Sequence, residues 1–349
     1  MRKAVPLLLL PAVLLGAEPA KTTLRYARGG DAVRLDPADI SDGESAKVTH
    51  QVFDTLVRFK ADGFDLEPAL AERWEHDADG LAWTFHLRAG VRFHDGTLLT
   101  SGIAKASLAR LLDPARPYAT SFTMIQAMET PDDLTLVVRL QRPYAPFLRN
   151  LAMFCAGIVP PCAADRNAFA RAPVGTGPFR FVAWHPNEKL VLAANPDCWD
   201  GPPGVDGLVF LPVPDNAKRL KLLESGGADL IDGISLNDVA GIERNRALRL
   251  HVVRPGANLA YLAFNTTRKP LDDARVRLAL ALALDRQGMV DHLFAGRARL
   301  AESVIPEGFL GHDPAFHYPA RDLAKAKALL KEAGLPDGFE TTLWVMPNP

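Results

Sequence analysis

The sequence predicts an α/β fold, because segments with strand-like and helix-like patterns alternate along the chain. Residues 83–87 alternate apolar and polar side chains, as a half-buried strand does. Val48, Val52 and Leu56 recur at intervals of four residues, which places them on one face of a helix. Hydrophobic residues make up 48% of the chain and charged residues 23%, as is usual for a globular protein.

The N-terminal two thirds contain most of the predicted elements. In chain order they are a strand at 22–27, a polar loop at 29–45, a helix running into a strand at 45–59, a helix at 101–112, a strand at 134–140, a turn and strand from 173, a strand at 205–213, a helix at 215–224 and a short strand at 229–234. Loops on a rigid scaffold often carry binding groups, but composition alone favours an ordinary surface connection for this polar loop.

Residues 83–96 predict a β-hairpin with aromatic side chains on its core face. Ala89-Gly90 supplies the turn, and the return strand continues to Asp95-Gly96. His86 and His94 fall on the opposite face, where we expect them to be solvated.

The C-terminal part predicts two helices and two short strands. A buried strand is expected at 259–265, and Asp272 and Asp273 are expected to cap the helix that follows. A second helix at 322–333 is expected to end at Gly334 in the left-handed conformation. A last strand is expected at 341–346. Because a strand needs partners for its backbone groups, we expect the chain to be a fragment of a longer protein.

The first 20 residues are typical of an export signal. Arg2 and Lys3 precede an apolar stretch at 5–15, and small residues follow, with cleavage expected after Ala17 or Ala20. The apolar stretch is too short to span a bilayer. A net charge of −1 argues against nucleic acid or an anionic membrane surface as a partner.

The three cysteines, Cys155, Cys162 and Cys198, allow at most one disulfide within the chain. A Cys155–Cys162 bond and three free thiols both remain open, because geometry decides between them. No histidine lies at ligand spacing from these cysteines, so a metal site is not expected. No cofactor is expected.

Motifs of enzymes are absent from the sequence, which contains no G-x-S-x-G elbow, no H-E-x-x-H pair and no P-loop. Gly175-Thr176-Gly177 is interpreted as a structural turn, because Pro178 removes a backbone donor that a phosphate cradle needs. His312 and His317 are separated by Pro314, which breaks helical spacing. We therefore expect a protein that is not an enzyme.

Several motifs, in a shared order, resemble one protein family. They are ALAERWEHDADGLAWTFHLRAGVRFHDG at 69–96, GTGPF at 175–179, NPDCWDGPPGVDGLVF from 195, AYLAFNTTRKPLDDARVRLALALALDR from 260, DLAKAKALLKEAG from 322 and FETTLWVMPNP at the end. Together they resemble the bacterial extracellular solute-binding proteins of family 5, which serve peptide and nickel ABC importers, and most closely the dipeptide-binding branch. Two positions depart from the family pattern: Cys198 replaces an aromatic residue, and the stretch after Thr97 lacks an acidic residue.

This resemblance implies a two-lobed periplasmic binding protein fold of the class with an extra domain. The implied divisions are a signal peptide at 1–20, lobe I at 21–57 and 172–258, an extra domain at 58–171 packed on lobe I, and the incomplete start of lobe II at 259–349. The two lobes would close on a ligand, and exclusion of water would strengthen charge pairs with the ends of a peptide.

The resemblance also implies a ligand-binding role for Ser41, Asp42 and Gly43, which match the family's first-lobe loop along the ligand. Gly43 would allow close backbone approach. Asp42 is either a cation-binding group or a surface carboxylate. The groups that bind the ammonium and the carboxylate of the ligand lie mainly in the family's second lobe, and none is assigned here.

The implied function is capture of di- or oligopeptides in the periplasm and delivery to an inner-membrane ABC permease. We expect a monomer that binds a small peptide and no nucleic acid. Nickel complexes, haem, glutathione and opines are alternative solutes. An exported α/β hydrolase is an alternative of a different class.

Overall fold

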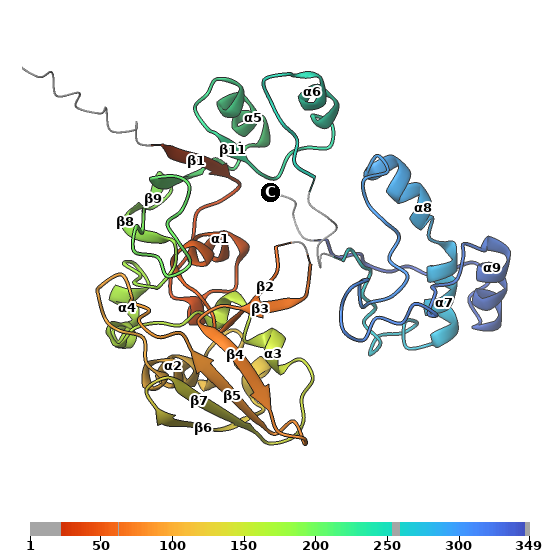
Figure 1. The fold of residues 1–349 in the computed structure, drawn as a ribbon. Coiled ribbons are helices and arrows are strands. Elements are labelled where there is room, and N and C mark those ends of the chain that lie inside the picture. Colours follow the sequence, from red (N-terminus) through yellow and green to blue (C-terminus); the bar gives the residue numbers. More distant parts are fainter. Residues whose placement is uncertain (1–21, 62, 253–258, 346–349) are drawn as a thin grey trace, which may run out of the picture.

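The computed structural model describes residues 22–61, 63–252 and 259–345, so the predicted export signal at 1–20 lies outside the described residues. Strands β1–β11 and helices α1–α6 form one body, and α7–α9 lie in a second region beside it (Figure 1). We call these the N-terminal body, residues 22–252, and the C-terminal region, residues 259–345.

The elements have the following bounds. The strands are β1 (Thr23–Arg28), β2 (Val57–Phe59), β3 (Leu66–Pro68), β4 (Ala71–His76), β5 (Ala82–Leu87), β6 (Ile125–Asp132), β7 (Thr135–Leu140), β8 (Phe179–His185), β9 (Lys189–Ala194), β10 (Gly207–Pro212) and β11 (Leu230–Ile231). The α-helices are α1 (Gly43–Val52), α2 (Ser101–Ala109), α3 (Phe147–Asn150), α4 (Arg166–Phe169), α5 (Asn216–Glu224), α6 (Val239–Arg244), α7 (Ala274–Ala283), α8 (Arg286–Gly288) and α9 (Leu323–Glu332). The short helical turns are η1 (Pro37–Asp39), η2 (Arg110–Leu112), η3 (Ala119–Phe122), η4 (Phe154–Ala156) and η5 (Pro161–Ala164), and η6 (Met289–Leu293) is a π-helix.

A five-stranded sheet has the order β11-β1-β10-β9-β8. Strand β1 pairs in parallel with β10, with Thr23 opposite Gly207, and also in parallel with β11. The β8, β9 and β10 strands pair antiparallel. The strands of this sheet therefore come from two stretches of the chain, 23–28 and 179–231.

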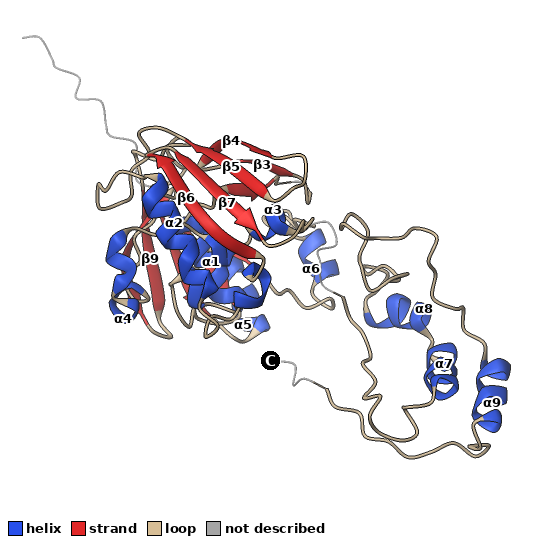
Figure 2. Cartoon of the chain, turned by 90° about the horizontal axis from the view of Figure 1, so that it is seen from below, coloured by secondary structure: helices blue, strands red, loops and turns tan. Residues whose placement is uncertain are grey.

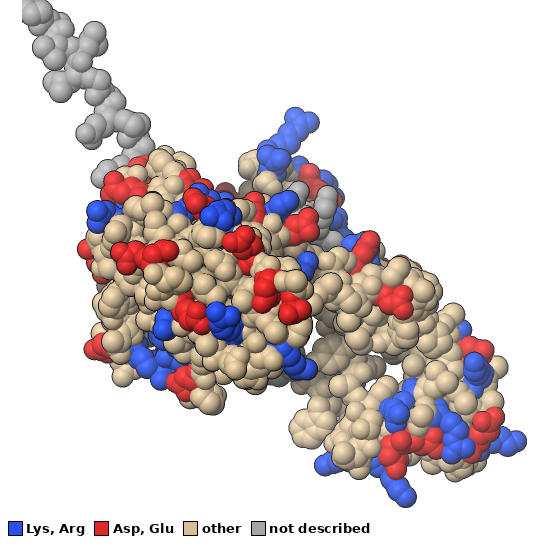
Figure 3. Space-filling view, turned by 60° about the horizontal axis from the view of Figure 1, so that its bottom comes forward, with Lys and Arg blue, Asp and Glu red and all other residues tan. Residues whose placement is uncertain are grey.

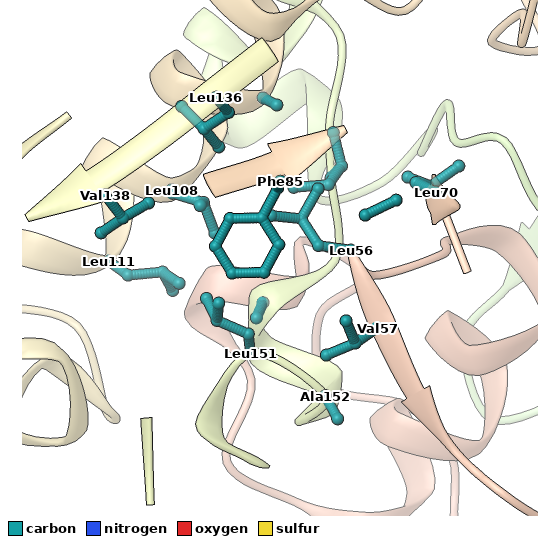
Figure 4. Packing of buried hydrophobic residues seen from close by; sticks show 14 of the residues in the cluster. Leu56, Val57, Leu70, Phe85, Leu108, Leu111, Leu136, Val138, Leu151 and Ala152 are labelled. Carbon is teal, nitrogen blue, oxygen red and sulfur yellow. The ribbon is translucent and has the colours of Figure 1, made fainter. Parts of the chain in front are cut away.

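A four-stranded antiparallel sheet, β4-β5-β7-β6, lies between those stretches in the sequence. Figure 2 shows it as a layer separate from the strand β9 of the first sheet. Phe85 on β5 is fully buried and is surrounded by Leu56, Leu136 and Leu151 (Figure 4). Burying such side chains contributes about 25 cal/mol per Å² of apolar surface removed from water. A two-stranded ribbon, β2–β3, stands beside this sheet.

Most predicted elements of the N-terminal body are confirmed. The strands predicted at 22–27, 134–140 and 205–213 are β1, β7 and β10, and the helices predicted at 101–112 and 215–224 are α2 with η2, and α5. The short strand predicted at 229–234 is β11. The helix that runs into a strand is α1 followed by β2.

The predicted hairpin at 83–96 is wrong. Strand β5 pairs with β4 on one side and with β7 on the other. The expected return strand instead folds back on itself, since Phe93 donates its N–H to Thr97 and Leu99 donates to Val91. Alternation predicted a strand correctly but does not specify its partners, which are the preceding strand β4 and the distant strand β7. His94 is not solvated either, because its ring contacts the turn at 175–177.

The C-terminal region is built around two helices. As predicted, Asp273 caps α7 and Gly334 has a positive φ of 78°. Asp272 is not the cap of α7, and Asp322 caps α9. The predicted strands at 259–265 and 341–346 are wrong, because residues 259–265 and 341–345 form no strand, and residue 346 lies outside the described residues. No strand in the described part of the chain pairs with either segment, and Tyr261 and Trp344 are 77% and 87% exposed.

The cysteines are free thiols, with Cys155 buried and Cys162 exposed. Over residues 22–345, apart from 62 and 253–258, no helix is long and apolar enough to cross a membrane. Acidic and basic side chains are interspersed over the face shown in Figure 3, in keeping with the near-zero net charge. Among the residues that the structure describes, no cluster of three or more histidine, cysteine or acidic side chains forms a metal site.

Candidate ligand-binding site

The carboxyl ends of the parallel strands β1, β10 and β11 meet at one edge of the five-stranded sheet. In open α/β sheets this edge is where loops form ligand-binding crevices. The loop that leaves β1 at Arg28 and enters α1 at Gly43 begins at this edge. Its final residues are the predicted site residues Ser41, Asp42 and Gly43, which the structure places together at the start of α1.

Asp42 is the N-cap of α1, and its Oδ1 accepts a hydrogen bond of 2.7 Å from the backbone N–H of Ser45. This bond satisfies one of the amide groups that a helix leaves unpaired at its start. Ser41 and Gly43 are exposed on either side of the cap. A Cβ atom built on Gly43 would meet no atom within 4 Å, so open space adjoins the backbone there. The loop therefore presents backbone and small side chains to any ligand at this edge.

A buried guanidinium group, that of Arg28, contacts both ends of this loop. Arg28 is fully buried, donates from Nη1 to the backbone oxygen of Glu44, and lies 3.5 Å from the carboxylates of Asp31 and Glu44. Burial lowers the pKa of Arg28, and Glu44 and Asp31 oppose that effect. The guanidinium thus holds the beginning and the end of the loop together.

A second set of charged groups lies on the solvent side of Arg28. The Lys47 ammonium contacts the carboxylate of Glu44 at 3.0 Å and that of Asp232. Tyr26 donates its hydroxyl proton to Asp232 at 2.7 Å. Burial and then the bond to Asp232 raise the pKa of Tyr26 far above its ordinary value. The tyrosine is therefore a neutral donor at any physiological pH.

Ion pairs also fasten the middle of the loop to neighbouring helical turns. Asp36 pairs with Arg110, and Asp39 pairs with Arg116 and, at 2.8 Å, with Arg166. Burial opposes ionisation of Asp39, but Arg166 and Arg116 outweigh it and lower the pKa. Because breaking a buried pair leaves an uncompensated charge, these pairs hold the loop in one conformation.

At the other end of α1 lies a cavity of about 320 Å³. Its lining comes from α1, β2, η4 and the loop after β9: Thr49, His50, Phe53, Asp54, Thr55, Arg58, Phe59, Ala69, Ala152, Phe154, Gly157, Pro178, Cys198, Asp200 and Gly201. The Asp54 carboxylate accepts two hydrogen bonds at Oδ2, from the Thr176 hydroxyl at 2.7 Å and from the Trp199 indole at 2.8 Å. Burial raises the pKa of Asp54 despite these two donors.

The turn at Gly175-Thr176-Gly177 is structural, as predicted. A Cβ atom on Gly175 would lie 1.9 Å from the backbone oxygen of Val52, and one on Gly177 would lie 2.8 Å from that of Gln51. The turn therefore requires glycine to pack against the end of α1. His94 clamps the other side of the turn, accepting from the Gly175 N–H at 3.2 Å and donating to the Gly177 carbonyl at 3.0 Å.

Asp54 is a polar residue that the sequence did not single out, although its partners Thr176 and Trp199 lie in two of the quoted motifs. Asp54 contacts Thr176 and Trp199, which are 122 and 145 positions away in the chain. A local pattern cannot show such pairing. The available signals were an acidic residue directly after the apolar face of α1 and a tryptophan in the NPDCWDG segment.

The chain is similar to a family of known proteins over most of its length. Residues 65–348 match the sequence model of the bacterial extracellular solute-binding proteins, family 5 middle. The chain is 34% identical to haem-binding protein A of Haemophilus influenzae over 94% of its length, and 35% identical to the glutathione-binding protein GsiB of Pectobacterium atrosepticum over 92%. It spans less than two thirds of the length of these curated relatives, 65% and 63% respectively.

Among solved structures, the chain resembles the periplasmic binding protein DppA of Helicobacter pylori in complex with the peptide STSA. The two share 34% sequence identity and a TM-score of 0.80, over 91% of this chain and 67% of that one.

Proposed function

Since the chain belongs to the bacterial extracellular solute-binding proteins of family 5, we propose that it is the peptide-binding subunit of an ABC importer. It captures di- or oligopeptides in the periplasm and delivers them to an inner-membrane permease. The observation that carries this proposal is the exposed loop at 41–43, held rigidly at the carboxyl edge of the parallel strands. The peptide complex of the H. pylori relative supports the choice of solute.

In this proposal Ser41, Asp42 and Gly43 line the ligand on the first lobe. The first lobe comprises 21–57 and 172–258, the extra domain comprises 58–171, and the second lobe begins at 259. The five-stranded sheet and the four-stranded sheet support this division, because each draws its strands from one of the first two units. The protein acts as a monomer, binds no nucleic acid and uses no cofactor.

Binding in this scheme depends on closure around the guest. A peptide carries an ammonium, a carboxylate and several backbone groups, all of which lose water when two lobes close on them. Fixed partners then interact more strongly with these groups than they do in water. The Arg28, Glu44, Lys47 and Asp232 groups keep their mutual pairs, so the loop needs little rearrangement to meet the ligand. A preorganised surface of this kind loses less entropy on binding.

The names of two relatives point to solutes other than simple peptides. One is named for haem and the other for glutathione, which is itself a tripeptide derivative. Mass spectrometry of ligand that co-purifies with the chain from its periplasm distinguishes the solutes. Recovery of short peptides is the expected result, and recovery of haem alone contradicts the peptide assignment.

A hydrolytic role is tested with the same peptides. Peptide recovered intact after incubation with the purified chain is expected, since the family consists of binding proteins. Cleavage at a rate proportional to protein concentration contradicts the proposal.

A further inference from the structure

The cavity at the end of α1 adjoins the β2–β3 ribbon. One of its walls is β2, and the tip of the β2–β3 ribbon contacts the C-terminal region, where the Phe64 and Phe309 ring centroids are 4.1 Å apart. Figure 1 shows this ribbon on the side of the N-terminal body that faces α7 and α8. This wall of the cavity therefore lies on the side of the N-terminal body that faces the C-terminal region.

Acidic side chains outnumber basic ones in and directly beside the cavity. Arg58 is already paired twice, with Glu67 at 2.7 Å and with Asp200 at 2.6 Å. Arg88 lies over the Trp199 ring at 4.9 Å and donates to a backbone oxygen. With Asp54 included, three carboxyl groups lie near two guanidinium groups. Burial raises the pKa of Asp54, and a cation bound beside this residue would favour its ionised form.

Other side chains at the cavity suit a cation. Partial desolvation beside the cavity lowers the pKa of His50, although the residue stays exposed on α1, and the neutral ring that this favours does not repel a positive group. The rings of Phe53, Phe59 and Phe154 line the cavity, and aromatic faces attract ammonium and guanidinium groups. Both hydrogen bonds of the Asp54 carboxylate go to Oδ2, so Oδ1 is left for a donor.

The exposed face of α1 connects this cavity to the loop at 41–43. Gly43, Lys47 and His50 are spaced four and three residues apart and share one helical face. The charge of Lys47 is compensated by Glu44 and Asp232. At 1.5 Å per residue, α1 is about 15 Å long. An extended peptide rises about 3.3 Å per residue, so about four residues cover this distance.

We propose that this cavity binds the cationic side chain of a lysine or arginine in a bound peptide, with Asp54 as its counter-ion. The rest of the peptide lies over α1, and its far end rests on the loop at 41–43. The importer then prefers basic peptides of about four residues over neutral peptides of the same size. This inference rests on the proposed peptide-binding function.

Isothermal titration calorimetry of the purified chain tests the preference with two matched pairs of peptides. One pair is Lys-Ala-Ala-Ala and norleucine-Ala-Ala-Ala, and the other is Ala-Ala-Ala-Lys and Ala-Ala-Ala-norleucine. Norleucine keeps the aliphatic stem and removes the ammonium. We expect the lysine peptide of one pair to bind about tenfold more tightly than its norleucine partner. The preferred pair also reveals which end of the peptide occupies the cavity.

Asp54→Asn then assigns the preference to this carboxylate. The amide oxygen still accepts from Thr176 and Trp199, so the fold is retained, while the negative charge is lost. We expect the lysine preference to fall to less than about twofold with norleucine binding unchanged. Asp197→Asn is the matched control, since Asp197 lies on the same loop as Trp199, is 81% exposed and does not line the cavity.

The possible outcomes separate the two proposals. Equal binding of lysine and norleucine peptides by the unaltered chain overturns the cation site and leaves peptide import standing. A lysine preference that survives in a folded Asp54→Asn chain also overturns it. If none of the peptides binds to the chain, both proposals fail. Binding of lysine and norleucine peptides to the unaltered chain requires no variant. This measurement therefore tests the cation site even if the Asp54→Asn chain does not fold.

Discussion

The N-terminal body and the C-terminal region differ in what holds them together. The body contains two sheets and two large apolar cores that between them include Phe85 and Phe210. The buried core of the C-terminal region comprises Ala279, Leu282 and Ala326, where α7 packs against α9. Several sheet partners in the body, such as β1 with β10 and β11, are far apart in sequence, whereas the helices of the second region are specified by local caps. The comparison shows that local signals suffice for helices but that strands form only where partners exist.

The largest expected effect concerns the turn that closes the body. Gly175→Ala places a Cβ atom 1.9 Å from the Val52 carbonyl, a backbone atom that cannot move without shifting the end of α1. We expect a loss of more than about 4 kcal/mol in the free energy of unfolding, measured by urea denaturation. Gly43→Ala is the control, because open space surrounds Gly43. Equal stability of the two variants would show that the turn is not packed as described.

A smaller and localised effect is expected in the C-terminal region. Leu282→Ala removes one of three buried side chains between α7 and α9, at a cost of about 2–3 kcal/mol to the stability of that region. Hydrogen exchange should then accelerate in α7 and α9 while β5 and β7 keep their protection. Faster exchange throughout both regions would mean that the two form one cooperative unit.

The next prediction concerns affinity at the loop. Ser41→Trp fills the space in front of the loop without touching the buried pairs beneath it, so we expect peptide affinity to fall about tenfold with no change in melting temperature. Calorimetry with the tightest-binding peptide measures the effect. Ser225→Trp, at an exposed serine after α5, serves as the control. Unchanged affinity in the Ser41 variant removes the loop from the ligand-binding surface.

The smallest expected effect is a pH dependence at the His94 clamp. Burial lowers the pKa of His94 below its ordinary value of 6.5, so the unfolded chain takes up a proton at this residue more readily than the folded chain. The contribution of His94 to stability is therefore complete above pH 7 and is lost as the pH falls through 6.5 toward the folded-state pKa. The loss of stability is measured as the decrease in melting temperature between pH 7.5 and pH 5.5. These values lie about one pH unit above and below 6.5.

His94→Gln should show a smaller decrease over that interval than the unaltered chain, since it has no proton to gain. The same decrease in both proteins would assign the pH dependence to other groups.

The elements that were predicted correctly have short-range signals. Asp273 and Asp322 precede their helices directly, and Gly334 follows its helix at the left-handed position. Strand β7 alternates over its whole length. The hairpin at 83–96 failed because alternation does not specify a partner, and β5 finds β4 and β7 instead.

The candidate site was predicted only in part. Ser41, Asp42 and Gly43 were assigned through a resemblance to a family motif, and their ligand-binding role stays a prediction. The structure adds that Asp42 caps a helix. The cavity at Asp54 was missed, because its walls come from segments as far apart as 49 and 201. Charge balance across such distances is visible only after folding.

The pairing of β1 constrains the order in which the N-terminal body folds. Thr22 bonds to Asp206, 184 residues later, and β1 pairs on both sides with strands that follow the entire four-stranded sheet. As the chain emerges, the four-stranded sheet can therefore fold while the first strand still lacks neighbours. The strand that is made first is among the last to be enclosed, so a nascent chain shorter than about 207 residues exposes it to chaperones or to other chains.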